Sequence, residues 1–342
     1  MKGRQVQLVR YPDGEVVPSD FRLVEVDVPA PGEGEVLVRN TWTSVDAGLR
    51  LRLRAKGPEG YFTAFPREAP MEGIMTVGEV VESRADGFEV GNTVWHASGW
   101  RDYAIVEAGK EALAGIGTLT KLDAAVNPPQ AYLGVLGGNG LTAYAGLFHA
   151  AGLREGDVVW VSAAAGAVGS LVAQLAKIRG HRVVASAGSE EKVAWLRDEL
   201  GVDAAFNYRA GPLPELLREA APDGIDVYFD NVGGDHLEAA IGALRRFGRV
   251  AICGAISEYD EATPPPGPSN MFLTVAKDLT IRGFRGSSYV HLLAEMSREM
   301  GTWLREGRIQ YRETIVEGLE RAPEALASLM RGDNTGKTLV RI

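Results

Sequence analysis

The fold is decided by the stretch Val158-Val159-Trp160-Val161-Ser162-Ala163-Ala164-Ala165-Gly166-Ala167-Val168-Gly169. Its first five residues predict a buried strand because four of them are apolar, and the small residues that follow predict a tight turn. Apolar residues then recur at helical spacing up to Gly180, and residues 182–186 predict the next strand. This order of strand, turn, helix and strand is typical of the βαβ unit that binds a dinucleotide pyrophosphate at the start of its helix.

The small residues of this turn have distinct tasks. Gly166 has no side chain to block close approach of its backbone to a phosphate, and Gly169 lets helix and strand pack tightly. Ala164 replaces the first glycine of the G-x-G-x-x-G pattern, so the match is A-x-G-x-x-G. We expect cofactor contacts from Ala165, Gly166, Ala167, Val168 and Gly169. The alternative is an ordinary crossover whose small residues serve only packing.

Length and composition limit the possible classes of protein. A chain of 342 residues is expected to form two domains. Its formal net charge of −9 argues against nucleic acid or an anionic membrane surface as a partner. No apolar run approaches the roughly 18 residues that span a bilayer. The single cysteine, Cys253, excludes an intrachain disulfide and favours a reducing compartment, so we expect a cytoplasmic protein.

The chain changes character along its length. Residues 1–128 contain many short strand-like runs separated by Gly and Pro clusters, which predicts a partly open β-barrel. Residues 158–284 alternate between strand and helix, which predicts an α/β domain over residues 129–300 with a doubly wound parallel sheet of six strands. Residues 301–342 are expected to return to the β domain as a tail. The predicted strands of the sheet are residues 158–162, 182–186, 204–207, 225–229, 249–253 and 279–283.

The end of the second predicted strand indicates which dinucleotide is bound. An NAD site has an acidic residue there that bonds the ribose 2′-hydroxyl, whereas this chain has Ala187-Gly188-Ser189. The small residues leave room for a 2′-phosphate, Ser189 can donate to it, and Lys192 attracts it. We therefore expect NADP(H) as the cofactor. Taken alone, Lys192 would more often be a lysine on a solvated helix face, and the missing acidic residue is what favours a phosphate contact.

Three later loops follow strands at the edge of the sheet where ligands bind. They begin at Asn207-Tyr208, at Asp230-Asn231 and at Gly254. Asn231 can bond a ribose or a carboxamide, although a turn-forming Asn is the alternative reading. The further expected cofactor contacts are Tyr208, Cys253, Gly254, Ala255, Ile256, Ser257 and Phe284.

The residue types leave few kinds of chemistry. The histidines show no paired spacing, Cys253 stands alone, and no G-x-S-x-G elbow is present, so we expect neither a metal site nor covalent catalysis. Hydride transfer from a nicotinamide remains, in which the protein positions and polarises the substrate. An enal or enone fits, because hydride adds to the β-carbon and a hydroxyl stabilises the enolate. Tyr259 is the candidate hydroxyl; its alternative is a surface-loop tyrosine.

The chain resembles a known family of enzymes. It is similar over nearly its whole length to the zinc-free branch of the medium-chain dehydrogenases/reductases, which includes leukotriene hydroxydehydrogenases/prostaglandin reductases, plant double-bond reductases and bacterial curcumin reductases. The resemblance rests on the runs Leu133–Leu136, Gly140–Tyr144, Ala163–Gly169, Tyr228–Gly234, Phe247–Ser257 and Asn334–Lys337.

This resemblance implies a GroES-like barrel, a Rossmann domain, and a homodimer joined through the sixth strand near Leu279–Phe284. It implies that Lys192, Ser189 and Tyr208 hold the 2′-phosphate end and that Asn231 and Asn334 contact the cofactor. Tyr259 matches the tyrosine of the family's Gly-Ala-Ile-Ser-x-Tyr motif, which supports the enolate there.

Three segments depart from the family pattern: Ser44–Arg50, Gly138-Asn139 and Arg285–Ser288. All three are expected on the substrate side, so the substrates of relatives are not carried over. The leading hypothesis is an NADPH-dependent alkenal/enone double-bond reductase. The alternatives are a quinone oxidoreductase and a non-catalytic NADPH-binding protein that acts as a sensor or has a structural role.

Overall fold

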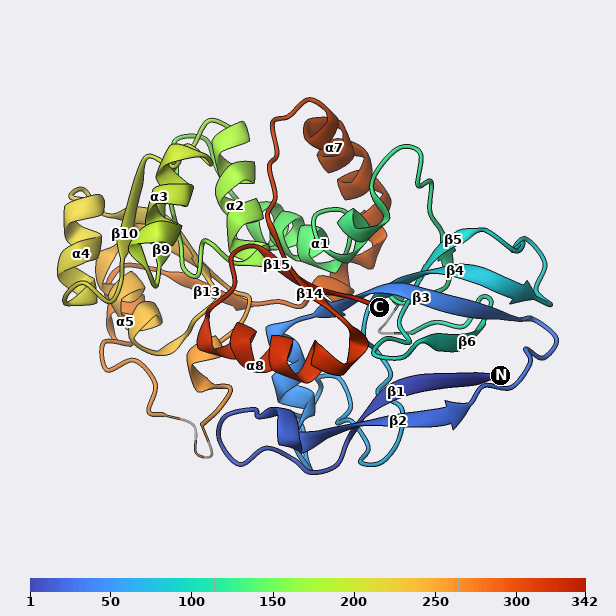
Figure 1. Cartoon of the computed structure of the whole chain (residues 1–342). Helices are drawn as coiled ribbons and strands as arrows, with labels where there is room; N and C mark the ends of the chain where they lie inside the picture. The colour runs from blue at the N-terminus through green and yellow to red at the C-terminus, as the bar shows by residue number, and fades with distance from the viewer. Residues whose placement is uncertain (113–114, 262, 264) are drawn as a thin grey trace. The chain divides into compact units, whose positions relative to one another are not determined.

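The computed structural model describes residues 1–112, 115–261, 263 and 265–342 (Figure 1). The chain divides into two compact units. The first unit consists of Met1–Gly138 together with Glu313–Ile342, and the second consists of Asn139–Arg312. These boundaries, at residues 138 and 312, lie later in the chain than the expected ones at 128 and 300.

The first unit is built on a mostly antiparallel sheet, which has seven strands among the described residues. Its order is β14-β15-β3-β4-β5-β7, with β6 also pairing with β3, and β1 and β2 form a separate pair. The strands are β1 (Lys2–Leu8), β2 (Phe21–Asp27), β3 (Glu35–Val45), β4 (Thr76–Ser83), β5 (Thr93–His96), β6 (Tyr103–Glu107), β7 (Thr120–Lys121), β14 (Glu313–Glu317) and β15 (Lys337–Arg341).

The C-terminal residues belong to the core of this first unit. Strand β15 pairs antiparallel with β3, so that Leu339 lies opposite Ser44. Helix α8 (Ala322–Arg331) contributes Leu326 to a buried cluster that also contains Leu8 and Trp100. Because these side chains come from both ends of the chain, the unit cannot bury its core without its last thirty or so residues.

The second unit contains a parallel sheet with the order β10-β9-β8-β11-β12-β13. This is the strand order of a doubly wound dinucleotide-binding fold, which confirms the predicted fold class. The strands are β8 (Val158–Val161), β9 (Arg182–Ala187), β10 (Ala204–Asn207), β11 (Ile225–Asp230), β12 (Leu244–Ile252) and β13 (Thr280–Gly283). The helices are α1 (Gly138–Ala145), α2 (Ala167–Ile178), α3 (Glu190–Asp198), α4 (Leu213–Ala220), α5 (Gly234–Ala243), α6 (Leu273–Ala276) and α7 (Leu293–Arg305).

Strand β8 is the centre of this sheet. Val159 lies opposite Val183 of β9 and Val227 of β11, so the strand is paired on both sides. Val159, Trp160 and Val161 are all completely buried. A strand covered on both faces of a parallel sheet needs apolar residues in succession, and each buried valine stabilises the fold by roughly 1.5–3 kcal/mol. The apolar run seen in the sequence therefore fixes the middle of the sheet.

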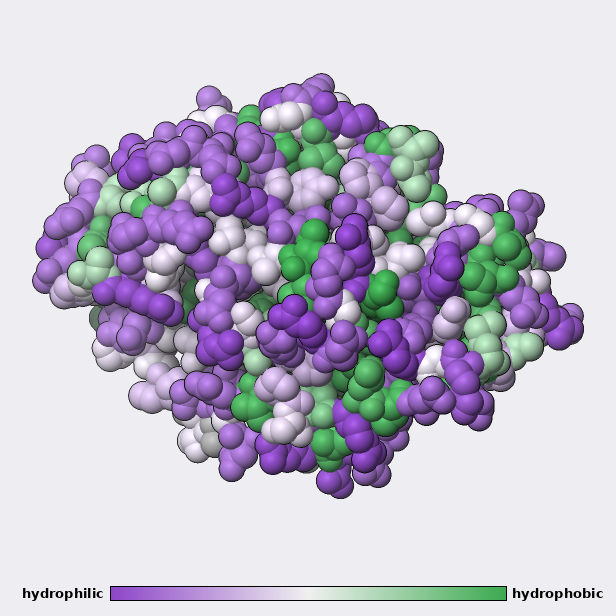
Figure 2. Space-filling view, viewed as in Figure 1, coloured by the Kyte–Doolittle hydropathy of each residue, from purple (hydrophilic) through white to green (hydrophobic). Residues whose placement is uncertain are grey.

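The face of the molecule seen in Figure 2 is mostly hydrophilic, and its hydrophobic residues occur in small groups. Within the described residues, no helix has both the length and the apolar character that a membrane crossing requires.

The turn from β8 into α2 depends on Gly169. A Cβ atom added there would lie 2.4 Å from the carbonyl oxygen of Ala163 and 2.8 Å from the Cα atom of Ala164. Both are backbone atoms, so they cannot move aside as a flexible side chain would. Gly169 thus allows the close approach of helix and turn that the sequence predicts.

We expect Gly169→Ala to lower the free energy of unfolding by about 1–3 kcal/mol, as overpacking does in cores. Within a helix, alanine usually stabilises by roughly 0.5–1 kcal/mol relative to glycine, but here the backbone clash outweighs that gain. Thermal denaturation measures the effect. Gly138→Ala, whose added Cβ meets no atom within 4 Å, is the matched control. A Gly169→Ala variant as stable as wild type would contradict the close approach.

Candidate active site

The start of helix α2 offers free backbone donors for an anion. Gly166 is the N-cap residue, no side chain caps the helix, and its first turn carries no acidic residue. The N–H group of Gly166 donates a hydrogen bond to the carbonyl oxygen of Ala163 at 2.9 Å, and this bond closes the turn. The N–H groups that begin an α-helix attract phosphate because they lack intrahelical partners. Residues 165–169 therefore fit a pyrophosphate.

The end of β9 holds the residues expected at the 2′-phosphate. A Cβ atom added at Gly188 would lie 3.1 Å from the hydroxyl of Tyr208, so the phenol lies directly over this glycine. Ser189 caps α3, because its Oγ accepts a hydrogen bond from the backbone N–H of Lys192 at 3.3 Å. This capping role was not predicted from the sequence. A serine directly before the first residue of a predicted helix is the usual signal for it. Gly188, Ser189, Lys192 and Tyr208 are thus brought together.

The Tyr208 ring rests on a stack of buried aromatic side chains. The His236 ring meets it edge to face at 5.0 Å between centroids, and His236 stacks in turn on Trp160 at 6.0 Å. Burial lowers the pKa of His236 to about 4, so its ring is neutral at neutral pH. The stack joins strand β8, the loop after β10 and helix α5, and it gives Tyr208 a fixed orientation.

Asp230, at the end of β11, organises the loop that follows it. Its Oδ1 accepts hydrogen bonds from the backbone N–H groups of Val232 at 2.9 Å and Gly233 at 2.8 Å, and from the Tyr228 hydroxyl at 2.8 Å. Burial is the main influence on this carboxyl and raises its pKa, although the two N–H donors and the phenol oppose that rise. Asp230 was not among the site residues predicted from the sequence.

The side chain of Asn231 is anchored to the neighbouring strand. Its Nδ2 donates to the carbonyl oxygen of Ser162 at 2.7 Å, and its backbone N–H donates to the Ser162 hydroxyl at 3.0 Å. With the amide nitrogen held in this way, the Oδ1 atom is the part of the side chain that can accept from a ribose hydroxyl or a carboxamide.

The loop after β12 is joined to the Asp230 loop through its backbone. The N–H groups of Cys253 and Gly254 donate to the Asp230 carbonyl oxygen, and that of Ile256 donates to Asn231. The Ser257 hydroxyl donates to the Val232 carbonyl oxygen at 2.6 Å. Burial, with a contribution from Asp230, raises the pKa of the Cys253 thiol to about 12, so the sulfur is protonated and is no nucleophile at neutral pH.

Tyr259 is held against the same loop. Its hydroxyl oxygen accepts a hydrogen bond from the Ala255 N–H at 3.3 Å and would lie 2.8 Å from a Cβ atom at Gly254. A phenol accepts one hydrogen bond and donates another, so this contact does not use the O–H bond. Glycine at position 254 is therefore required by the tyrosine, and both lie where the parallel strands end.

The remaining two predicted residues lie in different surroundings. The partly buried Phe284 ring packs edge to face on Phe229 at 5.9 Å and against Gly146. Asn334 belongs to the first unit, where its Nδ2 donates to the Gly336 carbonyl oxygen at 2.9 Å. A cofactor contact for either residue stays a prediction.

A buried lysine in the first unit was not singled out from the sequence. The Lys337 ammonium donates to the Ser44 hydroxyl at 2.7 Å, the Val45 carbonyl oxygen at 2.9 Å and the Asp46 carboxylate at 2.5 Å. Burial is the main influence on its pKa and lowers it, while Asp46 opposes that change. The lysine therefore connects the Asn334–Lys337 run to the segment Ser44–Arg50, two stretches that are far apart in the sequence.

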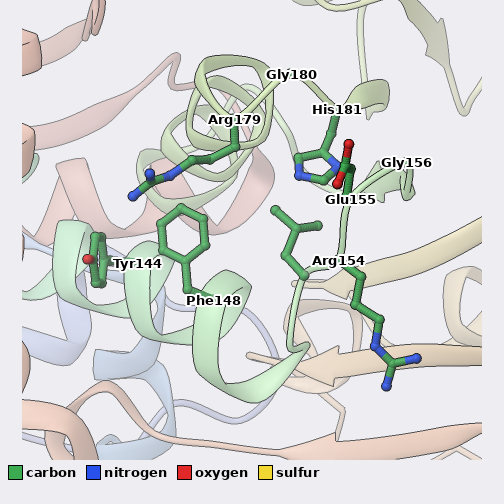
Figure 3. A pocket seen from close by; sticks show the side chains of 9 residues that line it. Tyr144, Phe148, Arg154, Glu155, Gly156, Arg179, Gly180 and His181 are labelled. Atoms are coloured by element: carbon green, nitrogen blue, oxygen red, sulfur yellow. The ribbon is translucent and has the colours of Figure 1, made fainter.

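A hollow at the other end of the sheet, with a volume of about 700 Å³, does not belong to this site. Figure 3 shows Arg179 close to the Phe148 ring among the lining residues, which also include residues 154–156 and 180–181. Those residues precede β8 and β9, whereas ligands of open α/β sheets bind where the strands end. The Tyr144 hydroxyl there donates to Glu295 at 2.9 Å, and burial raises its pKa above the usual range.

Two family matches cover most of the chain. Residues 4–113 match the family described as "N-terminal domain of oxidoreductase", and residues 167–303 match the one described as "Zinc-binding dehydrogenase". Catalytic zinc usually has three protein ligands. Within the described residues, no group of three or more His, Cys, Asp or Glu side chains is arranged to hold a metal ion.

Relatives match the chain from end to end. The NADPH-dependent curcumin reductase of Escherichia coli (strain K12) is 38% identical over 100% of this chain and 97% of its own. A 2-alkenal reductase (NADP(+)-dependent) of Nicotiana tabacum is 38% identical over 100% and 98%. The crystal structure of CurA in complex with NADPH from Vibrio vulnificus superposes with a TM-score of 0.91 at 37% identity, covering 99% of this chain and 98% of that one. The chain therefore belongs to the medium-chain dehydrogenase/reductase family, in the branch that the sequence resemblance indicates.

Proposed function

We propose that this protein reduces the C=C bond of α,β-unsaturated aldehydes and ketones with NADPH, by hydride transfer to the β-carbon and without zinc. The observation that carries this proposal is the position of Tyr259, whose hydroxyl is fixed over Gly254 and Ala255 at the ends of the parallel strands. The names of two whole-length relatives, an NADPH-dependent curcumin reductase and an NADP(+)-dependent 2-alkenal reductase, support the substrate class.

The residues at the strand ends fit NADP(H). Residues 165–169 would receive the pyrophosphate, and Asn231 with residues 253–257 would line the nicotinamide side. At the adenosine end there is no carboxylate at Gly188, and Glu190 is engaged by the Asn207 amide at 2.9 Å. Ser189, Lys192 and Tyr208 would receive the 2′-phosphate. Bound NADPH supplies a hydride, and the protein supplies position and polarity.

Tyr259 would polarise the substrate. When hydride reaches the β-carbon of an enone, negative charge develops on the carbonyl oxygen. A phenol O–H that is held in place stabilises this charge without having to reorient. It then donates a hydrogen bond to the enolate oxygen. The Ala255 N–H bonded to the same oxygen makes the phenol a better-positioned donor. This arrangement takes the place of a metal ion in activating the carbonyl.

NADPH oxidation, followed by its absorbance, tests the proposal with matched panels of enals, enones and quinones. We expect turnover of enals and enones with NADPH and formation of the saturated carbonyl product, identified by mass spectrometry. Quinone turnover far above that of every enal would favour the quinone oxidoreductase alternative. NADPH binding with no oxidation by either panel would favour a non-catalytic role.

We expect Tyr259→Phe to lower kcat by roughly 10²-fold, the usual loss when one oxyanion donor is removed. The dissociation constant for NADPH should stay unchanged, because the phenol acts on the substrate. Steady-state kinetics and cofactor fluorescence measure the two quantities. Tyr103→Phe, in β6 of the first unit, is a control that should leave both unchanged. If kcat is unaffected by Tyr259→Phe, the hydroxyl has no part in the mechanism.

We expect Lys192→Ala to raise the Michaelis constant for NADPH about tenfold and that for NADH little, because only NADPH carries the 2′-phosphate. Lys177→Ala removes a lysine of helix α2 that is ion-paired with Asp203 at 2.9 Å, and it should change neither constant. Equal increases for both cofactors would assign Lys192 a structural role instead.

We also propose a homodimer through the outer edge of β13. Three of the four β13 residues are exposed, and among the described strands β13 pairs only with β12. In the segment that precedes β13 in the chain, Phe272 is 78% exposed and Val275 is 68% exposed. Strand edges and apolar patches left open in this way are usually covered by another chain.

Val275→Asp should therefore convert the dimer to a monomer, as measured by sedimentation or light scattering. Val90 in the first unit is 67% exposed, so Val90→Asp is a matched control that should leave the dimer intact. A monomeric wild type, or a Val275→Asp variant that stays dimeric, would contradict this interface.

A further inference from the structure

Arg209 lies immediately after the residue that covers Gly188. It follows Tyr208 in the loop after β10, and its guanidinium carbon is 5.5 Å from the centre of the Tyr208 ring. Its backbone N–H donates to the Asn207 Oδ1 atom at 3.0 Å. The Arg209 side chain is exposed to solvent. Arg209 was not among the residues predicted from the sequence.

Contact with the Tyr208 ring places the Arg209 guanidinium near the start of α3. The phenol end of that ring lies over Gly188, and Gly188 directly precedes the helix cap Ser189. The ring itself is fixed from the other side by His236. A cation that rests on this ring is therefore presented near the same backbone turn as Lys192.

The charges around this turn require more than one cation. Glu190 and Glu191 both lie in the first turn of α3. A phosphate monoester adds a charge of about −1.5 to −2 at neutral pH. Lys192 alone cannot offset a phosphate together with two carboxylates. Asn207 holds Glu190 through its Nδ2 and the backbone of Arg209 through its Oδ1, so one amide links the nearest acid to the second base.

We propose that Arg209 is the second cation of the adenosine 2′-phosphate site and that it sets the preference for NADP(H) over NAD(H). This inference rests on the proposed cofactor. A guanidinium forms two parallel hydrogen bonds with a phosphate, and stacking on an aromatic ring orients it before the ligand arrives. Arg209 is thus a specificity-determining residue that binds the cofactor without contacting the reacting atoms.

Calorimetric titration of the full-length protein with 2′,5′-ADP and with 5′-AMP tests the inference. Arg209→Gln should weaken 2′,5′-ADP about tenfold, which is ~1.4 kcal/mol, and should leave 5′-AMP unchanged. Arg209→Lys keeps the charge but loses the planar fork, so its loss should be smaller. Arg218→Gln, an exposed arginine in the last turn of α4, makes the same charge change and should alter neither affinity.

The outcomes separate this inference from the proposed function. A wild type that binds 2′,5′-ADP no better than 5′-AMP would overturn both the NADP(H) assignment and the role of Arg209. A wild type that prefers 2′,5′-ADP, with an Arg209→Gln variant that keeps the full preference, would overturn only the role of Arg209. Equal loss of both ligands would make Arg209 a structural residue and would also overturn the inference.

A double-mutant cycle tests the part played by the Tyr208 ring. In a Tyr208→Phe background the ring remains, so Arg209→Gln should still weaken 2′,5′-ADP about tenfold. In a Tyr208→Ala background the support is gone and the effect of Arg209→Gln should shrink to less than about threefold. Undiminished loss in the Tyr208→Ala background would show that the guanidinium binds phosphate without the ring, and would overturn the stacked arrangement.

Discussion

The candidate site depends on one buried carboxylate, Asp230. Burying a charge without partners costs several kcal/mol, and this residue is completely inaccessible to solvent. Its Oδ1 meets two backbone N–H groups and a phenol, while its backbone carbonyl oxygen receives the N–H groups of Cys253 and Gly254. One residue therefore fixes its own loop and the next one. Asn231 and Tyr259 are held at the strand ends because both loops are anchored at this position.

The first unit has a comparable anchor of the opposite sign. Lys337 makes three hydrogen bonds to Ser44, Val45 and Asp46, and its stem packs against Gly134. A satisfied buried charge adds little net stability compared with an apolar side chain of the same size. It does restrict the arrangement, because any shift of strand β15 against β3 would leave the ammonium without acceptors. Asp230 and Lys337 thus fix the positions of neighbouring segments and contribute little to the free energy of unfolding.

Much of the fold could be predicted from the sequence because its signals are local. The apolar run of β8, the small-residue turn and the helical spacing of α2 lie within about twenty consecutive residues, and the parallel sheet followed from repeating that pattern. The contacts of the site are different. His236 supports Tyr208 across a stack that includes Trp160, and Lys337 meets Ser44 from the far end of the chain. No spacing rule connects such residues, so a single sequence could indicate Tyr208 and Lys192 but could not reveal what orients them.

Local charge, rather than total charge, decides what binds at the end of β9. The chain carries a net charge of −9, which alone would repel an anionic cofactor. At physiological ionic strength charges are screened beyond about 8 Å, so distant carboxylates contribute little there. The nearby acids Glu190 and Glu191 suit the start of α3, since negative groups stabilise a helix N-terminus. The same position is where a phosphate would bind. The helix thus gains stability from charges that would oppose a bound phosphate, and this conflict is the physical reason for proposing cations from two different segments beside Gly188.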